Sequence, residues 1–194
     1  MNYFLYLHSI TATYQTMNML VKINLSGSLK LLGFVFGLVF FSQNSFGQEE
    51  KFKALFIYNF TKYIEWPSTS KNEFKIGVLG NDNLYNELSE IAGRTKVGLK
   101  TMRITNAKTL LDVNDCEIVF ISRGNSSDLA KLTGMAKSNH ILLITETSNS
   151  CKQGAGLNFV LKNGSISFEV SKSNIESAGL QVNSNLLSLG IIVN

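Results

Sequence analysis

The sequence predicts one α/β domain, a three-layer sandwich with a mainly parallel central sheet, a C-terminal β-hairpin and flanking helices. Three short segments, at residues 74–80, 116–122 and 140–146, are apolar almost throughout and rich in β-branched residues. Such strands are typical of parallel sheets that helices cover on both faces. The intervening stretches have helical spacing, and an Asn-Gly pair at 163–164 separates two alternating segments.

A first helix is expected soon after residue 50. Apolar residues recur there at the spacing of one buried helical face: Phe52, Leu55, Phe56, Phe60, Tyr63 and Ile64. The helix should stop at Trp66, because the ring of Pro67 pushes the preceding residue out of helical conformation. We expect these aromatic side chains, and Trp66 with them, to pack in the core rather than to stack on a ligand.

Two further helices are expected between the central strands. The first should run from a cap at Asp82 to Gly93, and the second should follow a cap at Ser126 or Ser127. Residues 97–104 favour one more strand, and a short helix is expected near residues 107–111. This alternation of strands and helices is the pattern of a parallel sheet with crossover helices.

Residues 157–170 predict a hairpin with a definite register. Placing Asn163-Gly164 as a two-residue turn divides the side chains into an apolar face and a polar face, and a slip of one residue would invert both. The polar face includes Asn158 and Glu169 opposite each other. The predicted pairs are Lys162 with Ser165, Leu161 with Ile166, Phe159 with Phe168, and Leu157 with Val170.

Two short helices are expected after the hairpin. Ser173 and Glu176 have the spacing of a capping box, and Gly179 would close that helix. The last helix should lie near residues 184–189.

The first 47 residues have the pattern of an export signal. They contain no Asp or Glu, and two lysines precede an unbroken apolar run at residues 31–41. A spanning helix needs about 20 apolar residues, so the run fits a signal peptide cleaved before Gln48 better than a membrane anchor. Residues 48–194 then form a single exported domain. Residues 1–16 fit no part of a signal peptide, so a start at Met17 or Met19 is an alternative.

Charge and hydropathy exclude two classes of partner. The chain has 18 basic and 14 acidic residues, and two of the lysines lie in the export segment. So small an excess of positive charge provides no electrostatic footprint for nucleic acid. After residue 47 no apolar stretch is long enough to span a bilayer, so we expect no direct membrane insertion after cleavage.

The sequence is poor in residues that could carry catalysis. His140 is the only histidine after the export segment, and its place at the start of a strand favours a structural role. The two cysteines lack the close spacing of a zinc site, so no metal or other cofactor is expected. If the chain were an enzyme, it would use His140 or Glu146. That hypothesis predicts that these two side chains converge in one pocket.

Two strand ends could hold a small ligand. Gly80 lies between a strand and a helix, and Ser122 and Arg123 follow another strand, at the edge where α/β sheets commonly bind ligands. The stretch around Gly80 is neither a dinucleotide-binding motif nor a P-loop, so a tight turn is favoured over a phosphate site. Arg123 could meet an anion there. Solute binding at this edge is therefore the alternative function.

Three stretches together carry a resemblance to a known family. They are KFKALFIYNFTKYIEWP at 51–67, FKIGVLGND at 74–82 and GAGLNFVLKNGSISFEVSKSNIESAGLQVNSNLLSLG at 154–190. With the strands between them, they make the exported chain similar to the YfiR-like family over nearly its whole length. The resemblance implies a non-enzymatic regulator in the periplasm that binds the periplasmic domain of an inner-membrane protein, such as a diguanylate cyclase, and represses it. It also implies links to cyclic-di-GMP and biofilm output and a possible homodimer.

The resemblance also implies where the partner binds. The family's partner surface corresponds to residues 157–182 here, and Glu169 is the first expected contact because the hairpin register places it on the polar face. Ile175 is the second, although packing of this side chain onto the sheet is an equal alternative. Leu157 is the third, on a face that should be buried.

The resemblance also implies two disulfides, which relatives can carry and which link redox state to activity, and this sequence departs from that pattern. Cys116 and Cys151 match two of the four positions, while Gly77 and Asn158 occupy the positions of their partners. A bridge between Cys116 and Cys151 would have to join opposite strand ends, about 20 Å apart, whereas a disulfide requires Cα atoms within about 7 Å. Separate thiols are therefore favoured, and redox control by Cys116 and Cys151 is in doubt.

Overall fold

The computed structural model of the chain describes residues 45–68 and 70–193. The apolar run at 31–41 lies outside the described residues, and the predicted cleavage point before Gln48 falls within the first described helix. No helix in the described ranges is both long and apolar enough to cross a membrane. The described helices are α3 (Ser45–Phe60), α4 (Asp82–Ala92), α5 (Leu129–Asn139), α6 (Lys172–Ser177) and α7 (Ser184–Leu189).

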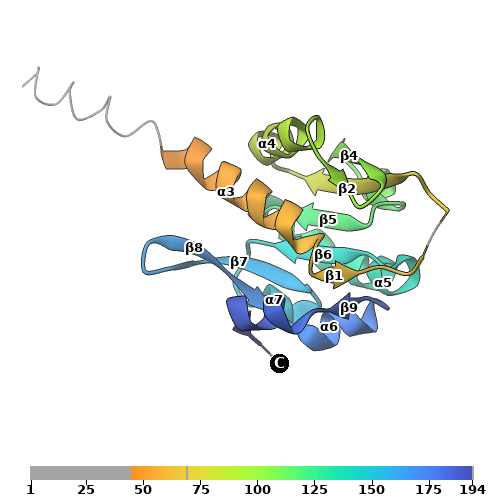
Figure 1. Cartoon of the computed structure of the whole chain (residues 1–194). Helices are drawn as coiled ribbons and strands as arrows, with labels where there is room; N and C mark the ends of the chain where they lie inside the picture. The colour runs from red at the N-terminus through yellow and green to blue at the C-terminus, as the bar shows by residue number, and fades with distance from the viewer. Residues whose placement is uncertain (1–44, 69, 194) are drawn as a thin grey trace, which may run out of the picture. The chain divides into compact units, whose positions relative to one another are not determined.

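An eight-stranded, mainly parallel sheet forms the centre of the domain, in the order β10-β8-β7-β6-β5-β2-β4-β3 (Figure 1). Within this sheet, the β7–β8 and β3–β4 pairs are antiparallel and the others are parallel. The predicted α/β class is therefore confirmed. The strands of this sheet are β2 (Glu73–Leu79), β3 (Lys96–Val97), β4 (Lys100–Ala107), β5 (Ile118–Ile121), β6 (Leu142–Thr145), β7 (Leu157–Lys162), β8 (Ser165–Val170) and β10 (Ile191–Ile192).

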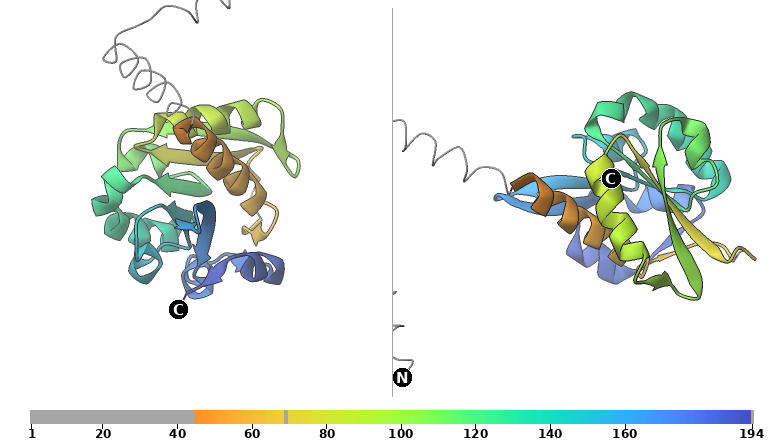
Figure 2. Two further views of the ribbon diagram at one scale, coloured as in Figure 1. Left: turned by 90° about the vertical axis from the view of Figure 1, so that its left-hand side faces the viewer. Right: turned by 90° about the horizontal axis from the view of Figure 1, so that it is seen from above.

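Helices cover both faces of the sheet, which makes three layers. Successive residues of a strand point to opposite faces, so Ile118 and Phe120 pack in the core with α3 and α4, whereas Val119 and Ile121 pack in the core with α5. Figure 2 (left) shows α3 and α5 on opposite sides of the sheet. Because both faces are covered, the central strands are apolar almost throughout, as predicted.

The first helix buries a face that overlaps the predicted one only in part, since Phe60 and Ile64 are buried but Phe52 and Leu55 are exposed. Ala54, Ile57 and Phe60 are its fully buried apolar residues, whereas Phe52 is 47% exposed. The helix also ends at Phe60 instead of Trp66, since a turn over residues 61–63 leads into β1 (Ile64–Glu65). Spacing alone could not decide between two overlapping apolar stripes, and the tertiary contacts selected the stripe that contains Ala54.

The hairpin has the predicted register. All four predicted pairs occur, from Lys162 with Ser165 to Leu157 with Val170. Asn163 and Gly164 have φ angles of 52° and 76°, which a two-residue hairpin turn of the Asn-Gly type requires. The side-chain alternation of the strands and the turn sequence favour the same pairing, so the local sequence was sufficient to predict the register.

Helix starts differ from the predictions by a residue or more. Asn81 caps α4, because its side-chain oxygen accepts a hydrogen bond from the backbone N–H of Leu84. The Asp82 carboxylate instead accepts a hydrogen bond from the side-chain amide of Asn106 in β4. Ser171 takes the place predicted for Ser173 at the start of α6. Helix α5 begins after the predicted serine caps, because the 3₁₀ turn η2 (Arg123–Asp128) occupies that stretch. The short helix predicted near 107–111 is the 3₁₀ turn η1 (Leu110–Val113).

Two small strand pairings were not predicted. Strand β1 pairs antiparallel with β9 (Gln181–Val182), and β10 adds to the sheet beside β8. Each pairing involves only two residues per strand, which is too short for an alternating pattern to identify. They join the C-terminal region to β1, which follows α3, and to the hairpin.

Candidate functional site

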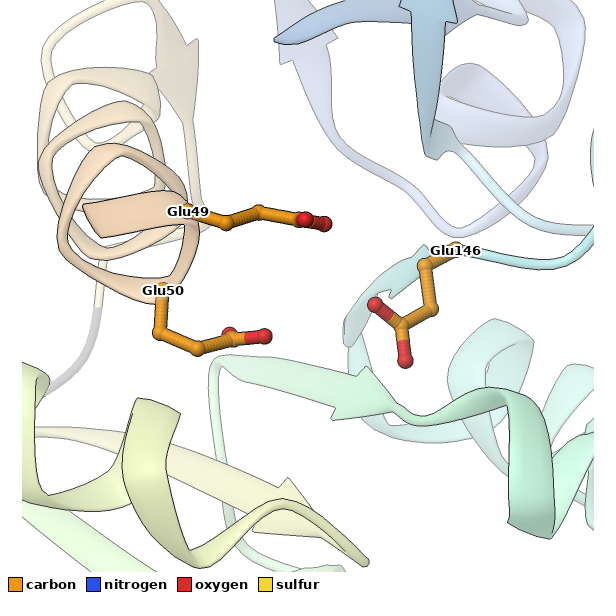
Figure 3. A group of neighbouring side chains, drawn as sticks. All are labelled: Glu49, Glu50 and Glu146. Carbon is orange, nitrogen blue, oxygen red and sulfur yellow. The ribbon is translucent and has the colours of Figure 1, made fainter. Parts of the chain in front are cut away.

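A buried lysine lies among three carboxylates where α3 meets the carboxyl edge of the sheet. The Lys53 Nζ lies 2.6 Å from a carboxylate oxygen of Glu146, 2.8 Å from Glu49 and 3.1 Å from Glu50, and its side chain is only 4% exposed. Figure 3 shows Glu49 and Glu50 reaching from α3 toward Glu146. We call these four residues the Lys53 cluster.

Helical spacing and a strand end assemble the Lys53 cluster. Residues three and four positions apart share a helix face, which brings Glu49 and Glu50 over Lys53. Glu146 directly follows β6. Burial alone lowers the pKa of Lys53, but hydrogen bonds that the ammonium donates to Glu146 and Glu49 outweigh this effect and hold its pKa above the ordinary value. The lysine therefore stays charged and links α3 to the sheet.

The carboxylates of the Lys53 cluster are close enough to one another to bind a cation. One oxygen from each carboxylate lies within 4.8 Å of the other two. The Lys53 ammonium already contacts all three, however, so a metal ion would have to displace a buried, hydrogen-bonded lysine. The arrangement is thus a salt-bridged anchor whose cation is supplied by the chain itself.

A cleft borders the Lys53 cluster between α3 and the hairpin, which lie side by side in Figures 1 and 2. Its volume is about 320 Å³, and a neighbouring cleft of about 510 Å³ extends it toward the hairpin turn. The exposed Phe52 and the 70% exposed Leu161 line the outer part. The cleft is lined by Glu49, Lys53, Arg123, Glu146, Ser148, Phe159, Val160, Leu161 and Ile166.

The predicted ligand residues do not converge in this cleft. Ser122 is buried, and its hydroxyl donates to the side-chain oxygen of Asn125 at 3.0 Å. Gly80, with a φ of 83°, packs so closely against Ser122 and Asn125 that no side chain would fit. Arg123 alone lines the cleft, where its backbone N–H donates to the Glu146 carboxylate at 3.2 Å and its guanidinium donates to the Glu146 carbonyl at 3.3 Å.

The three predicted partner contacts differ in accessibility. Glu169 is half-buried on β8 and accepts a hydrogen bond of 2.8 Å from the amide of Asn158. Ile175 is only 1% exposed and packs in the core, so the alternative of packing onto the sheet is the one observed. Leu157 is fully buried as well. In this structure Ile175 and Leu157 lie beneath the surface, and only Glu169 can be touched from outside.

The two cysteines are separate, buried thiols. Burial raises the pKa of Cys116 to about 12, an effect that the nearby Asp115 and Glu117 reinforce. Burial likewise raises the pKa of Cys151 to about 12. A Cβ atom built on Gly77 would lie 3.2 Å from the Cys116 sulfur, so the position that the family resemblance assigns to its disulfide partner is adjacent in space.

The two candidate catalytic side chains lie at opposite ends of one strand. His140 precedes β6 and its ring bonds the carbonyl of Ala178 at 2.9 Å, whereas Glu146 follows β6 and binds Lys53. The convergence that an enzyme would need is therefore not present between these two residues.

The sequence interpretation missed Lys53. The spacing of Glu49, Glu50 and Lys53 was a visible signal for ion pairs on one helix face. The partner that explains the burial of Lys53, Glu146, is 93 residues away along the chain, and no local pattern could have identified it.

Comparison with known proteins gives one family match. Residues 50–191 match the model of a family described as YfiR/HmsC-like. Among curated proteins, none matches this chain. The matched range begins in α3 and ends at the first residue of β10, so it covers the described sheet almost completely.

Proposed function

Because the chain belongs to the YfiR/HmsC-like family, we propose that it is a periplasmic regulator that binds and represses the periplasmic sensor domain of an inner-membrane signalling protein. That partner is a diguanylate cyclase or a sensor kinase, and its output is of the cyclic-di-GMP and biofilm type. The family match over residues 50–191 carries the proposal. The regulator reaches the periplasm through a cleaved signal peptide, needs no cofactor, and acts as a dimer by family likeness.

Glu169 is the proposed partner contact. A row of hydrogen bonds crosses three strands: the Thr145 hydroxyl donates to Asn158 at 2.7 Å, and the Asn158 amide donates to one Glu169 carboxylate oxygen. This row fixes the orientation of the carboxylate. The second oxygen, Oε1, accepts no hydrogen bond from any described residue, so it is available to a donor on the partner.

Redox control is not part of the proposed mechanism. Cys116 and Cys151 are buried apart from each other, and their raised pKa values keep them as protonated, unreactive thiols at neutral pH. Repression in this member would then depend on surface contacts alone.

Solute binding at the carboxyl edge has weaker support. The hydroxyl of Ser122 donates a hydrogen bond to Asn125, and the guanidinium of Arg123 donates one to the Glu146 carbonyl. The side chains of Ser122 and Asn125 also pack against Gly80. Few hydrogen-bonding groups remain there for a ligand.

Cellular cyclic-di-GMP provides the test of the proposed function. Deleting the gene in the native host should raise cyclic-di-GMP, and supplying the full chain from a plasmid should restore the lower level. Glu169→Lys should fail to restore it at an equal amount of folded protein, because reversing the charge removes an acceptor and repels a cationic donor on the partner.

Glu90→Lys is the matched control. Glu90 is an exposed glutamate on α4, outside residues 157–182, that forms an ion pair with Arg94 at 2.7 Å, and this variant should restore the level as the wild type does. A deletion that leaves cyclic-di-GMP unchanged would reject the cyclase as the partner. Full activity of Glu169→Lys would reject the proposed contact.

A further inference from the structure

A second cavity lies at the opposite edge of the sheet, near the amino ends of β6 and β7. Helix α5, helix α6 and the 3₁₀ turn η3 (Ser150–Gln153) enclose a volume of about 320 Å³. This volume is within the range of about 300–1,000 Å³ that is usual for small-molecule sites. Ile141, Leu142 and Ile175, all within the cores, form its floor.

The charged side chains that line this cavity are two lysines. Lys137 comes from the last turn of α5 and Lys152 from η3, and both are exposed at the rim. No lining residue carries a carboxylate. Within the described residues, neither ammonium group forms an ion pair or a hydrogen bond. Two like charges therefore share one cavity without a counter-ion.

The side-chain hydrogen-bond donors of the lining differ in whether they already have a partner. The side-chain amide of Gln153 forms no hydrogen bond with any described residue. In contrast, the Asn174 amide is fully engaged, because it donates to the carbonyls of Cys151 and Ala155 at 2.6 and 2.8 Å. The Ser177 hydroxyl is engaged as well and donates to the Asn174 carbonyl. The groups without a partner at the rim are thus the two ammonium groups and one amide.

We propose that this cavity binds a small oxyanion, a carboxylate or a phosphate, between Lys137 and Lys152. The anion neutralises the two ammonium groups and accepts hydrogen bonds from them and from Gln153. Any apolar part of the ligand lies against the floor formed by Ile141, Leu142 and Ile175. The ligand would bridge three separate elements, α5, η3 and α6, and the bound anion therefore stabilises the folded chain.

Thermal denaturation and calorimetry of the exported domain test this proposal with three probes. Inorganic phosphate and benzoate represent the two sources of the anion, and benzamide is the neutral counterpart of benzoate. All three are compared at one ionic strength set with sodium chloride, so that general screening is constant. Phosphate, benzoate or both should raise Tm in a concentration-dependent way, and benzamide should not.

Two variants assign the binding to the cavity. The double variant Lys137→Gln and Lys152→Gln should bind the effective anion at least ten-fold more weakly, with an unchanged Tm in chloride alone. Lys131→Gln is the matched control, since Lys131 is an exposed lysine on the same helix that does not line the cavity. It should bind like the wild type.

Each outcome either identifies the class of anion or rejects the proposed site. A larger effect of benzoate identifies an organic carboxylate, and a larger effect of phosphate identifies a phosphate group. No stabilisation by either anion, or equal binding by the double variant, would overturn the proposed site. Binding is measured on the purified domain, so the result is independent of the proposed regulatory function.

Discussion

Lys53 shows how one side chain can be both charged and buried. Its ammonium is withdrawn from water but contacts three carboxylates, and the hydrogen bonds to Glu146 and Glu49 keep it protonated. Removing one member of a buried ion cluster is costly because the other charges remain without compensation. The contribution of Lys53 to stability should therefore be large for a single lysine.

Lys53→Met should lower the free energy of unfolding by about 2 kcal/mol, since the carboxylates left behind are only partly exposed to water. Urea denaturation measures this quantity. Lys51→Met, on the exposed side of the same helix, should change it by less than about 0.5 kcal/mol. Equal effects of the two variants would show that the Lys53 cluster contributes no stability.

The buried thiols give a second prediction at the residue scale. At pH 8 a thiol reagent such as dithionitrobenzoate should not react with the folded domain, whereas both cysteines should react in denaturant. Rapid labelling of the folded protein would contradict the burial of Cys116 and Cys151.

The same thiols predict a loss of stability at alkaline pH. Unfolded thiols deprotonate near pH 9.0, while the folded ones retain their protons up to a pKa of about 12. The folded chain then binds more protons, so the free energy of unfolding falls as pH rises above 9, by up to about 1.4 kcal/mol per thiol at pH 10. Urea denaturation at pH 8 and 10 should show a smaller fall for the double variant Cys116→Ala and Cys151→Ala.

At the scale of the element, the register of the hairpin could be predicted from the sequence, whereas the buried face of α3 could not. The hairpin has a turn sequence and an alternation that permit one register, and that register is observed. Helix α3 is apolar around much of its circumference, so its periodicity permits more than one buried face. The face that contains Phe60 is buried against Phe159 and Phe168 of the hairpin, at ring-centroid distances of 6.1 and 5.0 Å.

Two phenylalanines of α3 test the orientation of the helix. Phe60→Ala should cost about 3–4 kcal/mol, because this fully buried ring leaves a cavity, whereas Phe52→Ala should cost less than about 1 kcal/mol. Chemical denaturation of both variants measures the difference. Similar losses would mean that the helix is rotated from the described position.

At the scale of the whole molecule, the sheet separates two different edges. Its carboxyl edge carries the Lys53 cluster, in which one ammonium group contacts three carboxylates and negative charge is in excess. The cavity near the amino ends of β6 and β7 carries two lysines without counter-ions. An anionic ligand is therefore expected at this cavity, on the edge opposite to the one that α/β sheets commonly use.

Hydrogen exchange should reveal the same layered organisation. Strands β2, β5 and β6 lie in the interior of the sheet with both faces covered, so their amides should exchange most slowly. The hairpin turn at Asn163 and Gly164 is exposed and should exchange rapidly. Mass spectrometry of peptides across 74–79, 118–121 and 142–145 provides the measurement. Fast exchange in these peptides would contradict the interior position of β2, β5 and β6 in the sheet.

The sequence by itself determined the α/β class, the central strands, the last helix and the hairpin register. These features depend on neighbours a few positions away, through side-chain alternation, turn chemistry and helical period. Of the candidate sites, it indicated Glu169 on a polar face and Arg123 at a strand end.

Only the tertiary structure decided which face of α3 is buried, that Ile175 lies in the core, and that Glu146 binds Lys53. It also decided the two-residue pairings of β1 with β9 and of β10 with β8, and it placed Lys137 and Lys152 around one cavity. The reason is physical: burial and charge compensation depend on residues far apart along the chain, and no local pattern records them.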